Sequence, residues 1–282
     1  MFIKVQDEKR HAKVGEPYSF QRKTDETNDQ LRSRLVALYA SEQRRDPEVF
    51  EDSLKVAAAP LATLVEHIEA ISLSKTDLDT KGMAFEAFMG GFFKGDFGQY
   101  FTPRDLINFC VEALEPGTDD RVLDPACGSG GFLLHALDLV RTQANDMYPD
   151  HNVDPEQFNA HYRMWHDFAQ NNLFGIEINE QLARVAKMNM IIHDDGHTNV
   201  VGHDALDFMR KLSAERKGLT AGSFDVVLSN PPFGGATVKS SEKGDDFLDQ
   251  YDLRAAVGGT TAVDLIEEEP CARRRQDGDP LP

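Results

Sequence analysis

A glycine-rich turn is the feature that most restricts what this chain can fold into. The letters DPACGSGG fill residues 124–131, at the end of a short strand pattern at residues 121–124 and before a helical pattern at residues 132–141. Glycine lets the backbone approach a ligand that any Cβ would block, and the free N–H groups at a helix start can bind polar ligand groups. A strand, a glycine-rich turn and a helix predict a parallel α/β sheet with a ligand at its carboxyl edge.

Strand and helix patterns go on alternating after this turn. Apolar runs predict strands at residues 173–178, 199–201 and 224–228, and Asn179 stands where it can cap the helix between the first two. A helix near residues 155–171 is predicted as an insertion. Such alternation implies parallel strands joined by right-handed crossovers.

The residues before the turn have a different pattern. From residue 28 apolar side chains recur at helical spacing, and a further helix is expected over residues 81–93. Glycines and a change of pattern near residue 96 mark a boundary. We therefore predict a flexible tail at residues 1–27, a helical domain at 28–95, an α/β domain at 96–235 and an irregular or divergent tail at 236–282.

The charge balance limits the partners that the chain can have. Its formal net charge is −18, so a nucleic-acid backbone should be repelled at long range. Either nucleic acid is not the substrate, or a basic partner subunit supplies most of the phosphate contacts. No apolar run approaches the ~18 residues of a membrane span, the first residues lack a signal-peptide core, and the three cysteines share no close spacing. We expect a cytoplasmic protein without a membrane span or a disulfide framework.

Acidic residues stand at the ends of successive predicted strands. Asp124 ends the first strand, Glu177 ends the second, and Asp204 lies just past the third. In a nucleoside site Asp124 can meet an amino group, Glu177 can accept two hydrogen bonds from a ribose diol, and Asp204 can accept one from an adenine amine. Together with Gly128 and Gly130 of the turn, this pattern predicts a cofactor site.

The letters NPPF at residues 230–233 follow the fourth predicted strand. Two consecutive prolines lack N–H groups and restrict the residues before them, so they form a rigid turn. The side-chain oxygen of Asn230 and the carbonyl of Pro231 can then accept both N–H groups of a purine amine, which makes its nitrogen nucleophilic. Phe233, after Pro232, can stack on a base rotated out of a duplex. These four residues are the predicted catalytic loop for methyl transfer to an amine.

These motifs, with GQYFTPR at residues 98–104 before them, resemble those of the amino-methylating DNA methyltransferases. More closely, residues 98–104 followed by residues 124–131 resemble the modification (M) subunit of type I restriction-modification systems, and the resemblance covers about residues 80–235. The resemblance implies a Rossmann-like S-adenosylmethionine-dependent methyltransferase sheet behind a small helical domain. It also implies that S-adenosyl-L-methionine methylates N6 of adenine in DNA, with a specificity subunit, a restriction subunit and a second M subunit as partners. Such partners would answer the problem of the acidic charge.

The resemblance also assigns roles to residues. The cofactor-binding set is Tyr100, Phe101, Thr102 and Pro103 over the methionine end, Asp124, Gly128 and Gly130 in the cofactor loop, Glu177 at the ribose and Asp204 at the adenine. The catalytic set is Asn230, Pro231, Pro232 and Phe233, and this motif points to adenine N6 rather than cytosine N4. The family's sheet continues past the catalytic loop, whereas residues 234–282 show no clear strand pattern. We therefore expect a sheet that is incomplete on this side and an isolated chain of poor activity.

Two other functions stay open at this stage. Methylases of ribosomal RNA guanine or of protein glutamine also use Asn-Pro-Pro followed by an aromatic residue, although Phe233 and residues 99–104 favour DNA. A truncated product would bind the cofactor or a partner without turnover. His193 and His197 are four residues apart, but the letters DDG between them indicate a helix end, so no metal site is predicted.

Overall fold

The computed structural model describes residues 2–10, 18–45, 47, 50, 53–73, 76, 102–193, 199–207 and 209–231. Two compact units divide the chain: Met1–Asp96 with Ile191–Asp194, and Phe97–Met190 with Asp195–Pro282. The predicted boundary near residue 96, the helix over residues 81–93 and the divergent tail at 236–282 lie outside the described residues.

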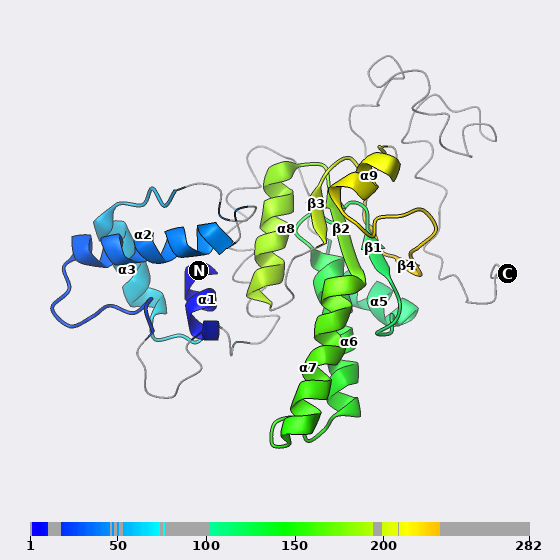
Figure 1. Cartoon of the computed structure of the whole chain (residues 1–282), viewed down its shortest axis with the longest axis horizontal. Helices are drawn as coiled ribbons and strands as arrows, with labels where there is room; N and C mark the ends of the chain where they lie inside the picture. Colours follow the sequence, from blue (N-terminus) through cyan, green and yellow to red (C-terminus); the bar gives the residue numbers. More distant parts are fainter. Residues whose placement is uncertain are drawn as a thin grey trace, which may run out of the picture. The chain divides into compact units, whose positions relative to one another are not determined.

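The described part of the first unit is helical. Its elements are α1 (Phe2–Arg10), α2 (Asn28–Arg45) and α3 (Ala58–Ile68), of which α2 and α3 pack together (Figure 1). Their common core consists of buried apolar side chains, namely Ile3, Phe20, Leu31, Leu35, Leu61, Ala62 and Val65. Helix α2 begins at the residue from which the periodicity predicts a helix.

The prediction of a flexible tail at residues 1–27 is wrong for α1. Three of its charged side chains are buried against partners: Lys4 Nζ lies 2.7 Å from Glu8 Oε1, and a carboxylate oxygen of Asp7 accepts the N–H of Phe20 at 2.7 Å. Ile3 is buried in the core beside them. A polar composition indicates a solvated segment only when the polar groups lack partners inside the protein, so composition alone was misleading here.

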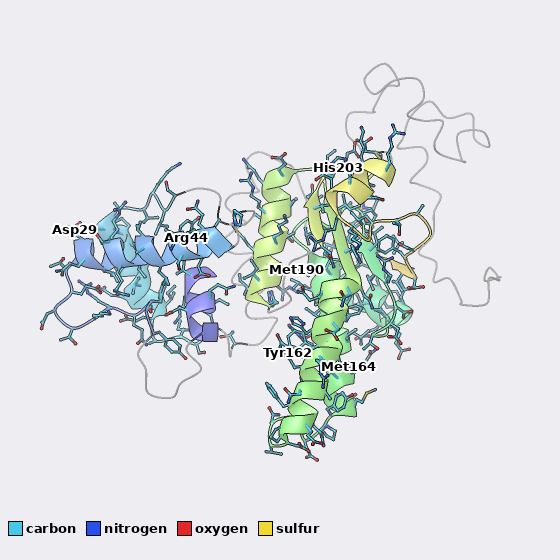
Figure 2. The ribbon with its side chains drawn as sticks, viewed as in Figure 1. Asp29, Arg44, Tyr162, Met164, Met190 and His203 are labelled. Atoms are coloured by element: carbon cyan, nitrogen blue, oxygen red, sulfur yellow. The ribbon has the colours of Figure 1, made fainter. Side chains whose placement is uncertain are left out.

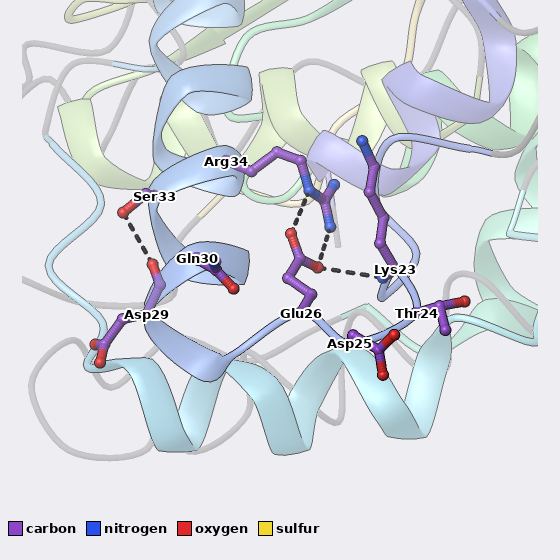
Figure 3. A pocket seen from close by; sticks show the side chains of 8 residues that line it. All are labelled: Lys23, Thr24, Asp25, Glu26, Asp29, Gln30, Ser33 and Arg34. Carbon is purple, nitrogen blue, oxygen red and sulfur yellow. Dashed lines mark hydrogen bonds and ion pairs between the residues drawn. The ribbon is translucent and has the colours of Figure 1, made fainter.

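An ion pair holds the chain at the start of α2 (Figure 3). Glu26 accepts two hydrogen bonds from the Arg34 guanidinium, both at 2.8 Å. The hydrogen bonding from Arg34 lowers the pKa of Glu26 to about 2, against the smaller opposing effect of burial. The open hollow around this pair is lined mainly by polar and charged side chains, and its central groups bond to one another. It is therefore part of the architecture of this unit and not a candidate active site.

Within the described residues of the second unit, four parallel strands form a sheet in the order β3-β2-β1-β4. They are β1 (Val122–Asp124), β2 (Leu173–Glu177), β3 (Val200–Gly202) and β4 (Val226–Val227). The register pairs Asp124 with Gly175 and Glu177 with Gly202. All four strands lie where the sequence predicts them, although β4 is shorter than the predicted 224–228. Because the strands are parallel, their carboxyl ends meet at one edge.

Helices cover both faces of this sheet, which makes three layers. The described helices are α5 (Arg104–Leu114), α6 (Gly131–Met147), α7 (Pro155–Asn171), α8 (Glu180–Ile192) and α9 (Met209–Glu215). The first four share a core with Val122 and Leu173 of the sheet, whereas α9 places Leu212 against Phe174 on the other face. Among the helices described, none is long and apolar enough to cross a membrane.

Helix α7 is the predicted insertion, and it packs along α6 (Figure 1). It begins with Pro155 at its first position, and Asp154 Oδ1 accepts the N–H of Glu156 at 2.8 Å. Its inner face carries Trp165, over whose ring the guanidinium of Arg141 lies at 4.3 Å. Figure 2 labels Met164 and Tyr162 on this helix, and Met164 packs against the common core while Tyr162 is half exposed. The insertion thus extends the helical layer that contains α6.

Candidate active site

The glycine-rich turn is tied to the neighbouring strand. The N–H of Cys127 donates to the carbonyl of Ile176 at 2.9 Å, and the N–H of Gly130 donates to the carbonyl of Cys127 at 2.7 Å. Gly128 (φ 55°) and Gly130 (φ 86°) are left-handed, a conformation that costs other residues about 1–2 kcal/mol. A Cβ at Gly128 would meet nothing within 4 Å. The turn is therefore held firmly and has open space beside it for a ligand.

Asp124 ends β1 with a carboxyl group that is only 1% exposed. Burial, with a smaller effect from the nearby carboxylate of Glu177, raises its pKa to about 7. The N–H of Ala126, which donates to Asp124 Oδ1 at 3.1 Å, opposes this effect. The buried Ser229 hydroxyl also lowers the pKa, although it reaches full hydrogen-bond geometry with no described residue. A carboxyl group with a pKa near 7 becomes ionised when a cation approaches. Such a group is suited to bind the ammonium group of a ligand.

Glu177 and Asp204 lie at the ends of adjacent strands. Both carboxylate oxygens of Glu177 accept backbone N–H groups, from Gly128 at 3.0 Å and from Asn179 at 2.9 Å, so its direction is fixed while each oxygen keeps a lone pair for a ligand. The N–H of His203, labelled beside β3 in Figure 2, donates to the carbonyl of Glu177 at 3.0 Å. Asp204 follows directly, and its Oδ1 accepts the N–H of Leu206 at 2.9 Å.

The residues after β4 bring Asn230 to the same edge. The N–H of Leu228 donates to the carbonyl of Leu123 at 2.9 Å, and the Leu228 side chain is fully buried. Asn230 therefore lies two residues beyond a fixed point that adjoins Asp124. Its side-chain Nδ2 donates to Thr102 Oγ1 at 3.0 Å. Thr102 comes just before α5, so a segment from before the sheet meets the end of the last described strand.

Of the remaining predicted site residues, some are described by the structure and others lie outside the described residues. Pro103 is the residue before α5, and Pro231 follows Asn230 at the end of a described range. Tyr100, Phe101, Pro232 and Phe233 lie outside the described residues, as does His197. Within the ranges that the structure describes, no group of three or more His, Cys, Asp or Glu side chains is arranged to hold a metal ion.

The strand order arranges the predicted groups along one edge. From β3 to β4 they are Asp204, Glu177, Asp124 and Asn230. Neighbouring strands lie about 4.8 Å apart, so three spacings set a length of roughly 14 Å. Two carboxylates, a buried carboxyl group and a side-chain amide thus follow one another in a row.

Sequence reasoning missed three residues of the site. Gly175 faces the turn from β2, where a Cβ would lie 2.7 Å from Leu133 Cδ1 and 3.1 Å from Cys127 Sγ. A single glycine inside an apolar strand is a signal of such close approach. Ile178, next to Glu177, is 68% exposed and offers an apolar surface at the edge. The third is Ser229, whose position beside Asp124 depends on the pairing of β1 with β4 and has no sequence signal.

Replacing Gly175 with alanine is expected to lower the free energy of unfolding by about 1–3 kcal/mol, because the added methyl group overpacks the contact between turn and strand. Urea denaturation followed by circular dichroism measures this change. Gly202→Ala is the matched control, since a Cβ there meets its nearest atoms at an ordinary 3.6 Å. Equal effects of the two substitutions would show that the close approach at Gly175 is unimportant.

Fold and site together define the class of this protein: it has the Rossmann-like α/β fold of the methyltransferases. The family model of the N-6 DNA methylases matches residues 76–260, and the chain belongs to this family. Membership implies the use of a methyl donor. The fold is shared with a solved modification subunit of a putative type I restriction enzyme from Vibrio vulnificus YJ016 (TM-score 0.54, 23% identity, 78% of this chain and 41% of that one).

Curated relatives are similar in sequence. The chain is 30% identical over 215 residues to the type I restriction enzyme StySPI methylase subunit of Salmonella potsdam, covering 73% of this chain and 38% of the relative. It is 34% identical over 144 residues to the EcoKI methylase subunit of Escherichia coli K12, covering 51% and 25%. The type II restriction enzyme and methyltransferase RM.BcgI of Heyndrickxia coagulans is 27% identical over 242 residues, covering 83% and 35%. The chain thus matches less than two fifths of the length of these relatives.

Proposed function

We propose that this chain transfers the methyl group of S-adenosyl-L-methionine to N6 of an adenine in DNA, as part of a type I restriction-modification complex. The observation that carries the proposal is the row Asp204, Glu177, Asp124 and Asn230 at one edge of the sheet. It follows the order in which a nucleoside, an amino acid and a methyl acceptor would have to lie. Membership of the N-6 DNA methylase family supports the choice of acceptor.

The residues at this edge fit the proposed cofactor. Asp124 would bind the ammonium group, since a buried carboxyl group with a pKa of about 7 becomes ionised beside a cation. Glu177 would accept hydrogen bonds from the ribose hydroxyls and Asp204 one from the adenine amine, while exposed Ile178 offers an apolar surface to the ring. The space beside Gly128 is where backbone would approach the ligand. When bound, S-adenosylmethionine supplies a methyl group activated by the sulfonium.

The chain's own contribution to the reaction lies at Asn230 and Pro231. An adenine amine has two N–H donors, and its nitrogen lone pair is delocalised into the ring. Acceptance of both N–H groups, by Asn230 Oδ1 and the Pro231 carbonyl, would draw the lone pair out of the ring and towards the methyl group. The amine then loses a proton after transfer, so no strong base has to act first. We propose Pro232 and Phe233 as the rest of this loop, with Phe233 stacking on the extruded base.

The charge of −18 indicates that the chain does not bind DNA alone. We propose that a specificity subunit brings the duplex, with a second M subunit and a restriction subunit in the full assembly. Support comes from relatives named as methylase subunits of type I enzymes. A solved structure with the same fold is described in terms of complex assembly of a type I restriction-modification system (TM-score 0.54, 22% identity, 89% of this chain and 50% of that one).

The test is methyl transfer to DNA with and without a specificity subunit from the same source. The chain is incubated with S-adenosylmethionine carrying a labelled methyl group and with unmethylated duplex, and the nucleosides are separated by mass spectrometry. We expect N6-methyladenine with the specificity subunit and little without it. Label in RNA guanine or protein glutamine would favour the other methylases. Cofactor binding without transfer to any of these acceptors would favour a binding fragment and contradict the proposal.

A further inference from the structure

One hydrogen bond joins a predicted cofactor-binding residue to a predicted catalytic residue. Asn230 Nδ2 donates to Thr102 Oγ1 at 3.0 Å, across 128 positions of sequence. The resemblance assigns Thr102 to the methionine end of the cofactor, a role that does not involve Asn230. Both residues are only partly exposed, so their bond is shielded from full competition by water.

Both partners of this bond are anchored. Thr102 precedes Pro103, whose carbonyl accepts the N–H groups of Leu106 and Ile107 at 3.0 and 3.1 Å. Ile107 is buried in the core, where its Cδ1 lies 3.0 Å from the place a Cβ would take on Gly131, at the start of α6. On the other side, Leu228 fixes the chain just before Asn230. The hydroxyl and the amide are therefore held at a set separation by the packed core.

This hydrogen bond is connected with the orientation of the Asn230 side-chain amide. A side-chain amide has an NH₂ donor at one end and an oxygen acceptor at the other. With the NH₂ bound to Thr102, the amide oxygen points away from that bond, and no hydrogen bond to it is formed by the residues that the structure describes. The Thr102 hydroxyl could also donate to the oxygen of a turned-over amide, but that amide would present its NH₂ to an amine that also carries only N–H groups, and two donors repel each other. Only the observed orientation is productive.

We propose that Thr102 is a positioning residue that holds the Asn230 amide with its oxygen towards the acceptor amine. The proposal rests on the function proposed above, and it changes the role of Thr102 from a cofactor contact to a part of acceptor activation. Thr102→Val removes the hydroxyl and keeps the shape of the side chain. Thr102→Ser keeps the hydroxyl. Thr142→Val is the matched control, because the hydroxyl of Thr142 bonds only within the exposed surface of α6, to the carbonyl of Asp138 at 3.0 Å.

The first measurement does not depend on activity. Nuclear magnetic resonance of the ¹⁵N-labelled chain reports the side-chain NH₂ of Asn230, which is assigned by its loss in Asn230→Asp. We expect Thr102→Val to shift this resonance and to speed its hydrogen exchange by about 3- to 10-fold, the range for one ordinary hydrogen bond. Thr102→Ser and Thr142→Val should leave it unchanged. An unchanged resonance in Thr102→Val would overturn the proposal, even if the chain proved not to be a methylase.

The second measurement separates positioning from cofactor binding. With the specificity subunit present, Thr102→Val should lower kcat about 3- to 10-fold, with the Kd for S-adenosylmethionine within twofold of the wild type, and Thr102→Ser should restore most of the rate. Adding Thr102→Val to Asn230→Ala should cause no further loss, because the amide to be positioned is gone. A rise in the cofactor Kd that matches the fall in rate would show that Thr102 acts in cofactor binding, and it would overturn the proposal. If the wild type shows no transfer, the proposed function fails while the resonance experiment still decides the role of Thr102.

Discussion

Asn230→Ala is expected to lower the rate of adenine methylation by about 10²- to 10³-fold, the usual effect of losing one oriented polar group from a reaction centre. The amide oxygen is the group that would accept an N–H of the target amine, and the backbone at Pro231 would still supply the second acceptor. The rate is measured as formation of N6-methyladenine in the presence of the specificity subunit. Residual activity should therefore be detectable above background.

We expect Asn230→Ala to lower the turnover rate and to leave the affinity for the cofactor nearly unchanged. Asn230 lies beyond β4, whereas the proposed cofactor-binding groups lie at the ends of β1, β2 and β3, so the Kd for S-adenosylmethionine should change less than threefold, within about 0.7 kcal/mol. Asn159→Ala is the matched control, because this amide is exposed on α7 and bonds only to the Pro155 carbonyl of its own helix. If Asn230→Ala retained near-normal turnover, the amide would have no part in acceptor activation.

The groups at the strand ends could be predicted from sequence because strands and turns have local signals. Asp124 and Glu177 each follow an apolar run and precede a helix, and a parallel sheet must bring such residues to one edge. The order of the strands was not predicted. It depends on which strands pair, and this order places Asp124 between Glu177 and Asn230.

Contacts between distant segments were beyond sequence reasoning. The bond between Thr102 and Asn230 joins residues 128 positions apart, and neither residue type indicates the other. Helix α1 was missed for a related reason. Lys4 and Glu8 form an ion pair that is 1% exposed, and this pair is buried only when the unit is folded. Local patterns therefore identify the chemical groups, whereas packing decides which of them meet.

Asp124→Asn is expected to stabilise the free chain at alkaline pH while weakening the binding of S-adenosylmethionine. Burial raises the folded-state pKa of Asp124 from 3.8 to about 7. Below pH 4 the carboxyl group is protonated in both the folded and the unfolded chain, and it has no effect. Between pH 4 and 7 the unfolded chain releases the proton and the folded chain keeps it, so stability falls as the pH rises. Above pH 7 the full penalty of roughly 4 kcal/mol is present.

Urea denaturation between pH 4.5 and 8.5 measures this dependence on pH. The wild type should lose stability across the range, and Asp124→Asn should remove the part due to this carboxyl group, because its amide oxygen can still accept the N–H of Ala126 but carries no charge. Asp146→Asn, at an exposed position of α6, is the matched control and should leave the profile unchanged. Parallel profiles for the wild type and Asp124→Asn would show that the pKa of Asp124 is not raised in the folded chain.

The same carboxyl group links cofactor binding to a proton. Binding of the ammonium group favours the ionised form, so at pH 6 the wild type should release up to one proton per cofactor bound, and at pH 8.5 almost none. Calorimetry in buffers with different ionisation enthalpies counts these protons, and Asp124→Asn should release none at either pH. On the proposed function, the fold would keep a destabilising acid at the end of β1 because its charge is needed when a cationic ligand is present. If the wild type bound the cofactor without proton release at pH 6, the ammonium group would have to lie elsewhere.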